Sequence, residues 1–197
     1  MSWAPNAHWI TTIGNYRQEG NDVEWRGEVY RWSKHYEWEK FLGLPSLAGP
    51  IFELALSIDG DTDRARLAAH SWRVVTPRRF SLDVFGAYPD YVRQSRAEFT
   101  VAKDQNVRLR SGWFSDRSAC YLASGKPVIT QDTGFSNLLP VGKGLFAVTT
   151  PEEAAAAVEM INADYRQHCD AARAIATEYF EATRVVGRLL RDLGLAG

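Results

Sequence analysis

The amino-acid sequence predicts an α/β fold, with a mostly parallel sheet of about six strands, helices on both faces and a helical C-terminus. Short apolar runs alternate with segments of helical periodicity over the first three quarters of the chain. The runs lack polar alternation, which is typical of strands buried on both faces of a parallel sheet. The last quarter of the chain shows helical periodicity alone. Strands that alternate with helices imply right-handed crossovers and therefore parallel pairing.

Strands and helices alternate in the first half of the chain. The strand-like runs are residues 10–13, 51–58, 73–76 and 97–102. Helical segments begin at the potential cap Ser33, at about Asp63, and at Pro89, since proline suits a first helical turn. The polar segment from Arg17 to Gly27 is expected to be a loop.

The second half adds two strands and then only helices. The strand-like runs are residues 128–130 and 144–148. Thr150, followed by a proline and two glutamates, begins a helix with a cap, an N1 proline and an acidic first turn. Helical stripes then run from Tyr165 to Tyr179 and from Val185 to Leu193. No strong domain boundary interrupts the chain, so residues 1–197 are expected to form a single Rossmann-like domain.

Composition excludes several classes of protein. The 197 residues are 45% hydrophobic and 24% charged, with a formal net charge of −1, which argues against broad electrostatic binding to nucleic acid or membranes. No apolar run is long enough to span a bilayer, and residues 1–12 lack the features of a signal peptide. Cys120 and Cys169 lie on expected apolar helix faces, which predicts buried free thiols and a cytoplasmic protein.

Tryptophan is unevenly distributed along the chain. Of the seven tryptophans, only Trp72 and Trp113 lie beyond the first fifth. Rings of this size usually cover core or interface surface. The alternative is an exposed patch that contacts another domain or a sugar.

The segment from Gly112 to Phe135 is expected to form a loop, a helix, a tight turn, a buried strand and a glycine loop. Ser115 is a natural N-cap for the helix, and a Gly-x-Pro turn ends it. Gly134 follows the strand at the carboxyl edge of the sheet, where open α/β sheets bind ligands. Free amides and the positive dipole end make the helix start, from Gly112 to Ser118, a candidate site for a phosphate or another anion.

Five cations near this segment are candidates for neutralising phosphate. They are Arg17 after the first strand, Lys103, Arg108 and Arg110 before the helix, and Arg117 in its first turn. A solvated loop is the alternative for each loop cation, and an ordinary capped helix is the alternative for the helix start. Asp116 supports that second alternative, because its carboxylate competes with an anionic ligand for the same dipole.

Other chemistries have little support in the sequence. The four histidines show no zinc-ligand spacing, and neither a GxSxG elbow nor a GxxxxGK[ST] phosphate loop occurs. No GxGxxG follows the first strand, so the dinucleotide fingerprint is missing. Glu53 and Glu98 lie within expected strands and are expected to face solvent or a neighbouring chain. No catalytic residue, metal or cofactor is predicted.

The phrases SGWFSDRSACYLASGKPV and QDTGF resemble the C-terminal, nucleotide-sugar-binding half of GT-B fold glycosyltransferases. They also resemble uncharacterised bacterial glycosyltransferase-like proteins, and the resemblance covers roughly residues 11–195. It implies that a donor diphosphate rests on the helix N-terminus while the nucleoside lies along neighbouring loops. Carried over by position, it implies donor contacts at Trp113, Phe114, Ser115, Asp116, Arg117, Thr133, Gly134 and Phe135, with Arg17 nearby.

Two departures from the family pattern bear on activity. Retaining members commonly hold the ribose with a glutamate, where this chain has Cys120, and the earlier glutamate of the same motif corresponds to Trp113. A complete enzyme of this fold also has two Rossmann-like domains, whereas this chain supplies one.

The resemblance therefore implies a domain that binds a nucleotide-diphosphate sugar. Glycosyl transfer would then require an N-terminal acceptor domain, a partner subunit or a homo-oligomer. A non-catalytic interaction or scaffold protein on a degenerate glycosyltransferase fold is the first alternative, and an unrelated α/β phosphate-binding enzyme is the second. Neither nucleic acid nor a membrane span is expected.

Overall fold

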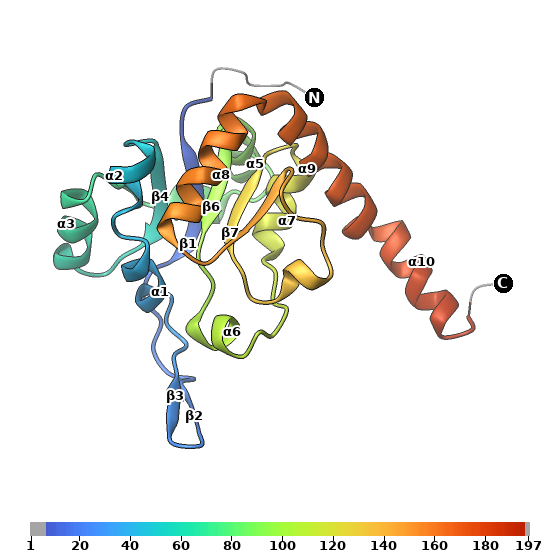
Figure 1. Ribbon diagram of the computed structural model, residues 1–197, viewed down its shortest axis with the longest axis horizontal. Helices are drawn as coiled ribbons and strands as arrows, with labels where there is room; N and C mark the ends of the chain where they lie inside the picture. The colour runs from blue at the N-terminus through green and yellow to red at the C-terminus, as the bar shows by residue number, and fades with distance from the viewer. Residues whose placement is uncertain (1–6, 196–197) are drawn as a thin grey trace.

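The computed structural model of the protein describes residues 7–195 and contains a six-stranded parallel sheet (Figure 1). The strands lie in the order β5 (Arg73–Val75), β4 (Phe52–Ser57), β1 (Ile10–Asn15), β6 (Ala97–Thr100), β7 (Val128–Gln131) and β8 (Leu145–Val148). Counted along the chain, this is the order third, second, first, fourth, fifth, sixth of doubly wound nucleotide-binding folds. The predicted α/β, Rossmann-like class is confirmed.

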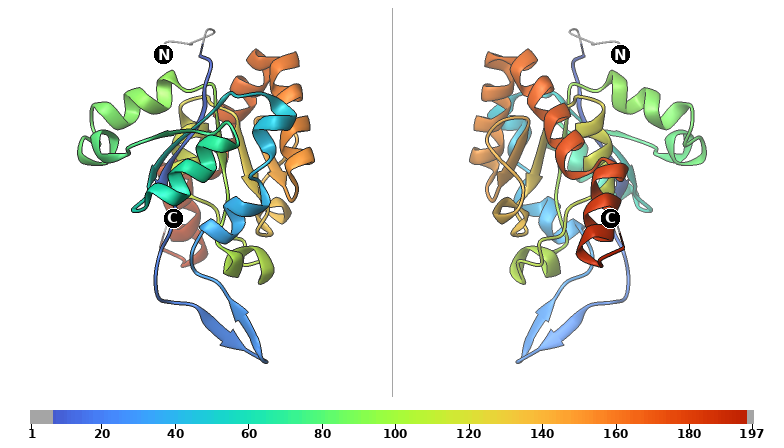
Figure 2. Two further views of the ribbon diagram at one scale, coloured as in Figure 1. Left: turned by 90° about the vertical axis from the view of Figure 1, so that its left-hand side faces the viewer. Right: turned by 90° about the vertical axis from the view of Figure 1, so that its right-hand side faces the viewer.

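Helices cover both faces of the sheet (Figure 2). One face carries α1 (His35–Lys40), α2 (Leu44–Ala48), α3 (Asp61–Ala69) and α8 (Pro151–Ala163). The other carries α5 (Ala87–Gln94), α7 (Asp116–Ala123) and α9 (Tyr165–Tyr179). Shorter or peripheral helices are α4 (Arg78–Leu82), α6 (Asp104–Arg108), the 3-10 helix η1 (Phe135–Asn137) and α10 (Ala182–Asp192).

Two hydrophobic cores fill the space between the sheet and its helices. The first joins α1, α2 and α8 to the sheet and contains an aromatic cluster, in which the ring of Trp38 lies 5.7 Å from that of Phe99 and Phe52 lies 5.1 Å from Trp72. The second joins α5, α7 and α9 to the opposite face. Trp38 and Trp72 are therefore core residues, as one of the two interpretations of the tryptophans predicts, whereas Trp25 is 52% exposed.

The loop expectation for Arg17 to Gly27 is confirmed for residues 17–22 but wrong for Val23–Trp25, which forms one strand of a β-hairpin. Strands β2 (Val23–Trp25) and β3 (Glu28–Tyr30) pair antiparallel and project from the body of the molecule (Figure 1). Arg26 and Gly27 form the turn with φ of 53° and 76°, the geometry that matches the twist of paired strands. The strands are too short and too exposed to carry an apolar pattern. Helix α6 stabilises them instead, since Arg108 Nη1 donates to the Val29 carbonyl at 2.8 Å.

The two cysteines are free thiols, but only Cys169 is buried as predicted. The prediction of a buried Cys120 is wrong, because α7 turns Ser118, Tyr121 and Leu122 inward and leaves Cys120 exposed.

Helix α10 extends away from the body and buries none of its residues (Figure 1). Among the described residues, no helix combines the length and apolar character needed to cross a membrane.

Candidate functional site

The six strands of the main sheet all point the same way, so the segments that follow β1, β6 and β7 meet at one edge of that sheet. This edge is the lower one in Figure 1, where the hairpin and α6 lie. The strand order reverses between β1 and β6, and open α/β sheets bind ligands outside the carboxyl ends of such strands. The β1–β6 ladder has only two residue pairs, Ile10 with Ala97 and Thr11 with Glu98, whereas β1 pairs with β4 over six. The two central strands therefore separate toward this edge.

Arg117 occupies the space between the separating strands. Its guanidinium donates to the Ile13 carbonyl of β1 at 2.6 Å, to Thr100 Oγ1 of β6 at 2.8 Å and to Glu98 Oε1 at 2.5 Å. Burial by itself lowers the pKa of Arg117, but the Glu98 carboxylate outweighs it and raises the pKa above its ordinary value. The Arg117 guanidinium, which was expected to bind phosphate, thus points into the protein and joins α7 to both β1 and β6.

Glu98 is fully buried, so the expectation that it faces solvent or another chain is wrong. The paired guanidinium of Arg117 is the physical reason, since a buried carboxylate needs a counterion. Glu53 is also buried, at 7% exposure, and forms an ion pair with Arg73. A strand's apolar neighbours do not reveal such a partner, which comes from a distant part of the chain.

The start of α7 differs in detail from the predicted cap. Ser115 is the N-cap residue with an extended backbone, but its hydroxyl makes no capping hydrogen bond and lies 3.5 Å from Asp116 Oδ1. Asp116 itself accepts a hydrogen bond from the Arg117 amide at 2.8 Å. The carboxylate of Asp116 therefore occupies part of the positive end of the helix dipole.

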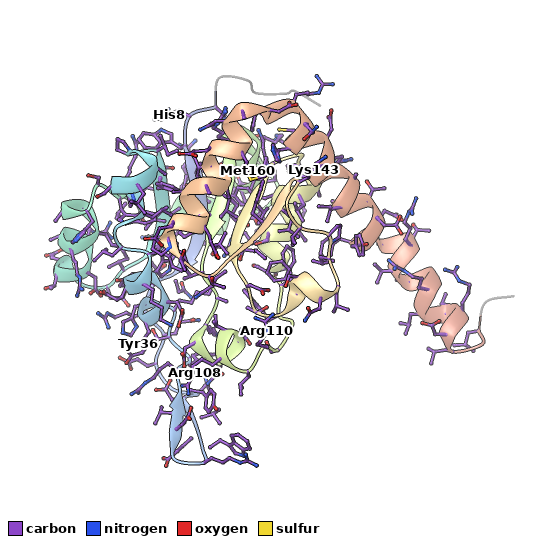
Figure 3. All side chains as sticks on the ribbon, in the orientation of Figure 1. His8, Tyr36, Arg108, Arg110, Lys143 and Met160 are labelled. Atoms are coloured by element: carbon purple, nitrogen blue, oxygen red, sulfur yellow. The ribbon has the colours of Figure 1, made fainter. Side chains whose placement is uncertain are left out.

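Three hydrogen bonds join the loop before α7 to the loop after β7. The Gly112 amide donates to the Thr133 carbonyl at 2.8 Å, and Thr133 Oγ1 donates to the Trp113 carbonyl at 2.5 Å. Arg110 Nη2 donates to Asp132 Oδ2 at 3.0 Å. The structure thus brings Arg110, Gly112, Trp113 and Thr133 together as one unit at the carboxyl edge, beside the Arg110 label in Figure 3.

Gly134 completes this unit. Its φ is 96°, and a Cβ there would lie 3.1 Å from the Arg110 carbonyl oxygen. Its amide donates to Asp132 Oδ1 at 2.9 Å. The close approach that requires glycine is therefore one between two loops of the protein itself.

Phe135 is buried, and the partly buried Phe114 packs against it. Their rings lie 5.1 Å apart edge to face, and Phe114 also stacks on Phe180 at 5.3 Å. Phe135 is 2% exposed. Through Phe180, these rings join the loop before α7 and the loop after β7 to the C-terminal end of α9.

Arg17 and Arg108 are held away from α7 by other partners. Arg17 Nη2 donates to Asp63 Oδ1 of α3 at 2.8 Å, on the β4 side of β1. Arg108 binds the hairpin through Glu28 and Val29. The structure does not bring these two cations to the start of α7.

Lys34 also lies near the start of α7, although no sequence motif marks it as a ligand-binding residue. Its ammonium is 5.3 Å from the centre of the Trp113 ring, and no hydrogen bond or ion pair joins it to any residue within 7–195. Burial lowers the pKa of Lys34 to about 7, with the positive charge of Arg117 adding to the effect and Glu98 opposing it. In the sequence, Lys34 is distinguished only by following the potential helix cap Ser33. Ser33 lies 80 residues before Trp113, so nothing local indicates the contact between Lys34 and Trp113.

Lys103 makes a second lysine–tryptophan contact at the same edge. Its ammonium lies over the ring of Trp32, and burial lowers its pKa. The charge of Lys103 also acts on Lys34. The edge therefore presents two partly desolvated cations and two aromatic rings.

This arrangement suits electrostatic binding of an anion better than proton transfer. The Glu98 carboxylate is paired with Arg117, and Asp116 is engaged by a backbone amide. Within the part of the chain that the structure describes, no group of three side chains could hold a metal ion. The site therefore offers positive charge from Lys34 and Lys103.

Comparisons with known proteins show similarity in fold to a solved structure, but no match to a protein family or to a curated sequence. A scan of protein-family models finds no match, and no curated protein matches the sequence. Among solved structures, a chain from the crystal structure of the GtfA/B complex aligns with a TM-score of 0.55 at 16% sequence identity, covering 96% of this chain and 37% of that one. The chain thus spans little more than a third of its structural neighbour. The protein has a glycosyltransferase-like fold.

Proposed function

We propose that this chain is the nucleotide-sugar donor-binding domain of a glycosyltransferase. The observation that carries the proposal is the unpaired ammonium of Lys34 beside Trp113, at the point where the strand order reverses. A partly buried cation without a counterion is unfavourable, and a bound anion relieves that cost. The glycosyltransferase-like fold supports a nucleoside diphosphate as the anion.

In the proposed complex, Lys34 and Lys103 neutralise the diphosphate, and Arg17 joins them by exchanging Asp63 for phosphate. The backbone of the loops containing Arg110, Gly112, Trp113, Ser115, Asp116, Thr133 and Gly134 surrounds the ligand. Arg117, Phe114 and Phe135 act as positioning residues, because their side chains are engaged with the protein. During transfer, the lysines stabilise the charge that develops on the leaving diphosphate.

Transfer requires an N-terminal acceptor domain or a partner subunit in this proposal. Two observations support that requirement: the chain spans 37% of its structural neighbour, and that neighbour was solved as a complex. The free thiols favour a reducing, cytoplasmic setting.

Calorimetric titration with UDP, GDP, ADP and TDP tests the proposal. At least one nucleotide is expected to bind, and Lys34→Met should weaken that binding about tenfold, the effect of losing one charged contact. Lys143→Met is the matched control, because Lys143 is exposed and lies at the opposite end of the sheet (Figure 3). If no nucleotide binds at millimolar concentration, the donor-domain proposal is wrong.

A non-catalytic interaction or scaffold protein is the second candidate function. Helix α10 favours it, because Val185, Val186, Leu189 and Leu193 are between 42% and 62% exposed. In that case nucleotide titrations give no heat, and light scattering after size exclusion detects association. A monomer that binds a nucleotide contradicts this candidate.

A further inference from the structure

A cavity of about 380 Å³ lies far from the carboxyl edge. Its lining comes from the first or second residue of three adjacent strands, Thr11 of β1, Glu53 of β4 and Arg73 of β5, and from the helices α4 and α5. The volume is within the range of small-molecule sites. Because the lining residues begin their strands, this cavity and the donor site are at opposite ends of the sheet.

The floor of the cavity is polar and fixed in place. Thr11, Glu53 and Arg73 are direct neighbours in the strand register and so lie side by side on one face of the sheet. Glu53 Oε1 accepts a hydrogen bond from the Tyr91 hydroxyl at 2.8 Å, and Arg73 Nε lies 2.7 Å from Glu53 Oε2. Thr11 Oγ1 lies 2.6 Å from Ser95 Oγ. Thr11 and Glu53 are buried, and burying such polar groups is unfavourable unless they are hydrogen-bonded, whereas Arg73 at the edge of the row is exposed.

Aromatic rings form the walls. Phe80 of α4 stacks on Tyr91 of α5 with ring centres 4.0 Å apart, and the Arg73 guanidinium lies 4.8 Å from the centre of the Trp9 ring. All four side chains line the cavity. Flat apolar surfaces of this kind favour a ligand with a planar body.

Four charged side chains line the cavity: the carboxylates of Glu53 and Asp90 and the guanidiniums of Arg73 and Arg79. Arg73 pairs with Glu53, and Asp90 pairs with Arg93. Arg79 lines the cavity and forms no ion pair or hydrogen bond with any residue that the structure describes. A negatively charged group on a ligand would supply the partner that Arg79 lacks among these residues.

We propose that this cavity is a second binding site, and that its ligand is a small planar monoanion such as an aromatic carboxylate. The carboxylate pairs with Arg79 at the rim and the ring lies against Phe80 and Trp9. The site is independent of the donor site, so both ligands bind at once.

Benzoate is the probe for this site, followed by NMR titration of the Trp9 indole N–H in the whole chain. A dissociation constant on the order of 1 mM is expected for a fragment of this size. Benzamidine and benzyl alcohol have the same ring with a positive or no charge, and they should bind at least about tenfold more weakly. UDP should leave the benzoate titration unchanged.

Three variants separate charge from shape. Arg79→Gln should weaken benzoate binding about tenfold, whereas Arg78→Gln, on the same helix but outside the cavity, should leave it unchanged. Ala87→Phe adds a ring to the lining and should abolish binding. The proposal is overturned if benzoate at about 20 mM does not shift Trp9, if benzyl alcohol binds as tightly as benzoate, or if UDP displaces benzoate.

Discussion

Lys34 is the residue on which the candidate site depends most. Its ammonium faces a tryptophan ring, and the charges that act on it come from three elements: Arg117 and Asp116 of α7, Glu98 of β6, and Lys103 before α6. Burial lowers the pKa of Lys34 to about 7, and the cations Arg117 and Lys103 add to that effect. Its charge therefore changes within the physiological range of pH, unlike that of an ordinary lysine.

Nucleotide binding should weaken as the pH rises through 7. Below pH 7 the Lys34 ammonium is protonated and attracts the diphosphate, and above pH 7 it loses its proton and the attraction. We expect UDP affinity to fall about tenfold between pH 7 and pH 9, where the diphosphate itself keeps a constant charge. Calorimetry across this range measures the effect, and Lys34→Met should flatten the profile. An identical slope in that variant would assign the titration to another group.

Arg117 and Glu98 form the second residue-scale feature. Arg117→Leu leaves the Glu98 carboxylate buried without a counterion and should cost about 3–5 kcal/mol of unfolding free energy in urea denaturation. The double variant Arg117→Leu, Glu98→Leu should recover most of this loss, since an apolar pair needs no desolvation of charge. The pair is also imperfectly satisfied, because Glu98 Oε2 has no hydrogen-bond partner among the described residues. A double variant no more stable than Arg117→Leu would contradict this account.

The site was harder to predict than the elements that carry it, and Arg17, Arg117 and Lys34 show why. A sequence gives the type of a side chain and its place along the chain, but its direction depends on the nearest opposite charge in space. Asp63 and Glu98 determine the directions of Arg17 and Arg117. No periodicity relates Lys34 to Trp113, so their contact was not available from the sequence.

At the scale of elements, the central strands were predictable because they are rich in apolar and β-branched residues and are buried, whereas the edge strand β5 is more exposed. The hairpin was not, since its three-residue strands depend on hydrogen bonds from α6 rather than on burial. The loop–helix–strand–loop order of Gly112 to Phe135 was also predictable, because glycine and proline mark its boundaries. Its internal hydrogen bonds, such as that from Thr133 to Trp113, were not.

The contact between β8 and α9 provides a prediction at this scale. Gly144 precedes β8 with φ of 73°, and a Cβ there would lie 2.3 Å from the Ala172 amide nitrogen of α9. Gly144→Ala should therefore lower the unfolding free energy by about 2–5 kcal/mol through strain and overpacking. Gly142→Ala is the control, because Gly142 has a φ of 96° but no atom lies within 4 Å of the added Cβ. Its unfolding free energy should fall by only about 1–2 kcal/mol, from backbone strain alone. Equal losses in urea denaturation would exclude the steric contribution.

At the scale of the whole molecule, α10 lies outside both hydrophobic cores. None of its residues is buried, and its arginines contact α9 only through the exposed residue Glu178. Truncation after Phe180 should therefore change the melting temperature by less than about 2 °C, because exposed ion pairs contribute little. Thermal unfolding measures this, and light scattering shows whether the apolar stripe of α10 causes association. A large fall in melting temperature would mean that α10 packs on the domain in solution.

The short ladder between β1 and β6 has a consequence for how the protein can be divided. It leaves two three-stranded halves joined by two residue pairs, by Arg117 and by the shared helical layers. A cut in the segment between α4 and α5 yields fragments that each keep three strands and have to reassemble along this seam. Lys34 belongs to one fragment and α7 to the other. A nucleotide that contacts both, as proposed, would stabilise the association of the two fragments. If the nucleotide binds as proposed, the two halves could serve as a split reporter, whose reassembly would increase with nucleotide concentration.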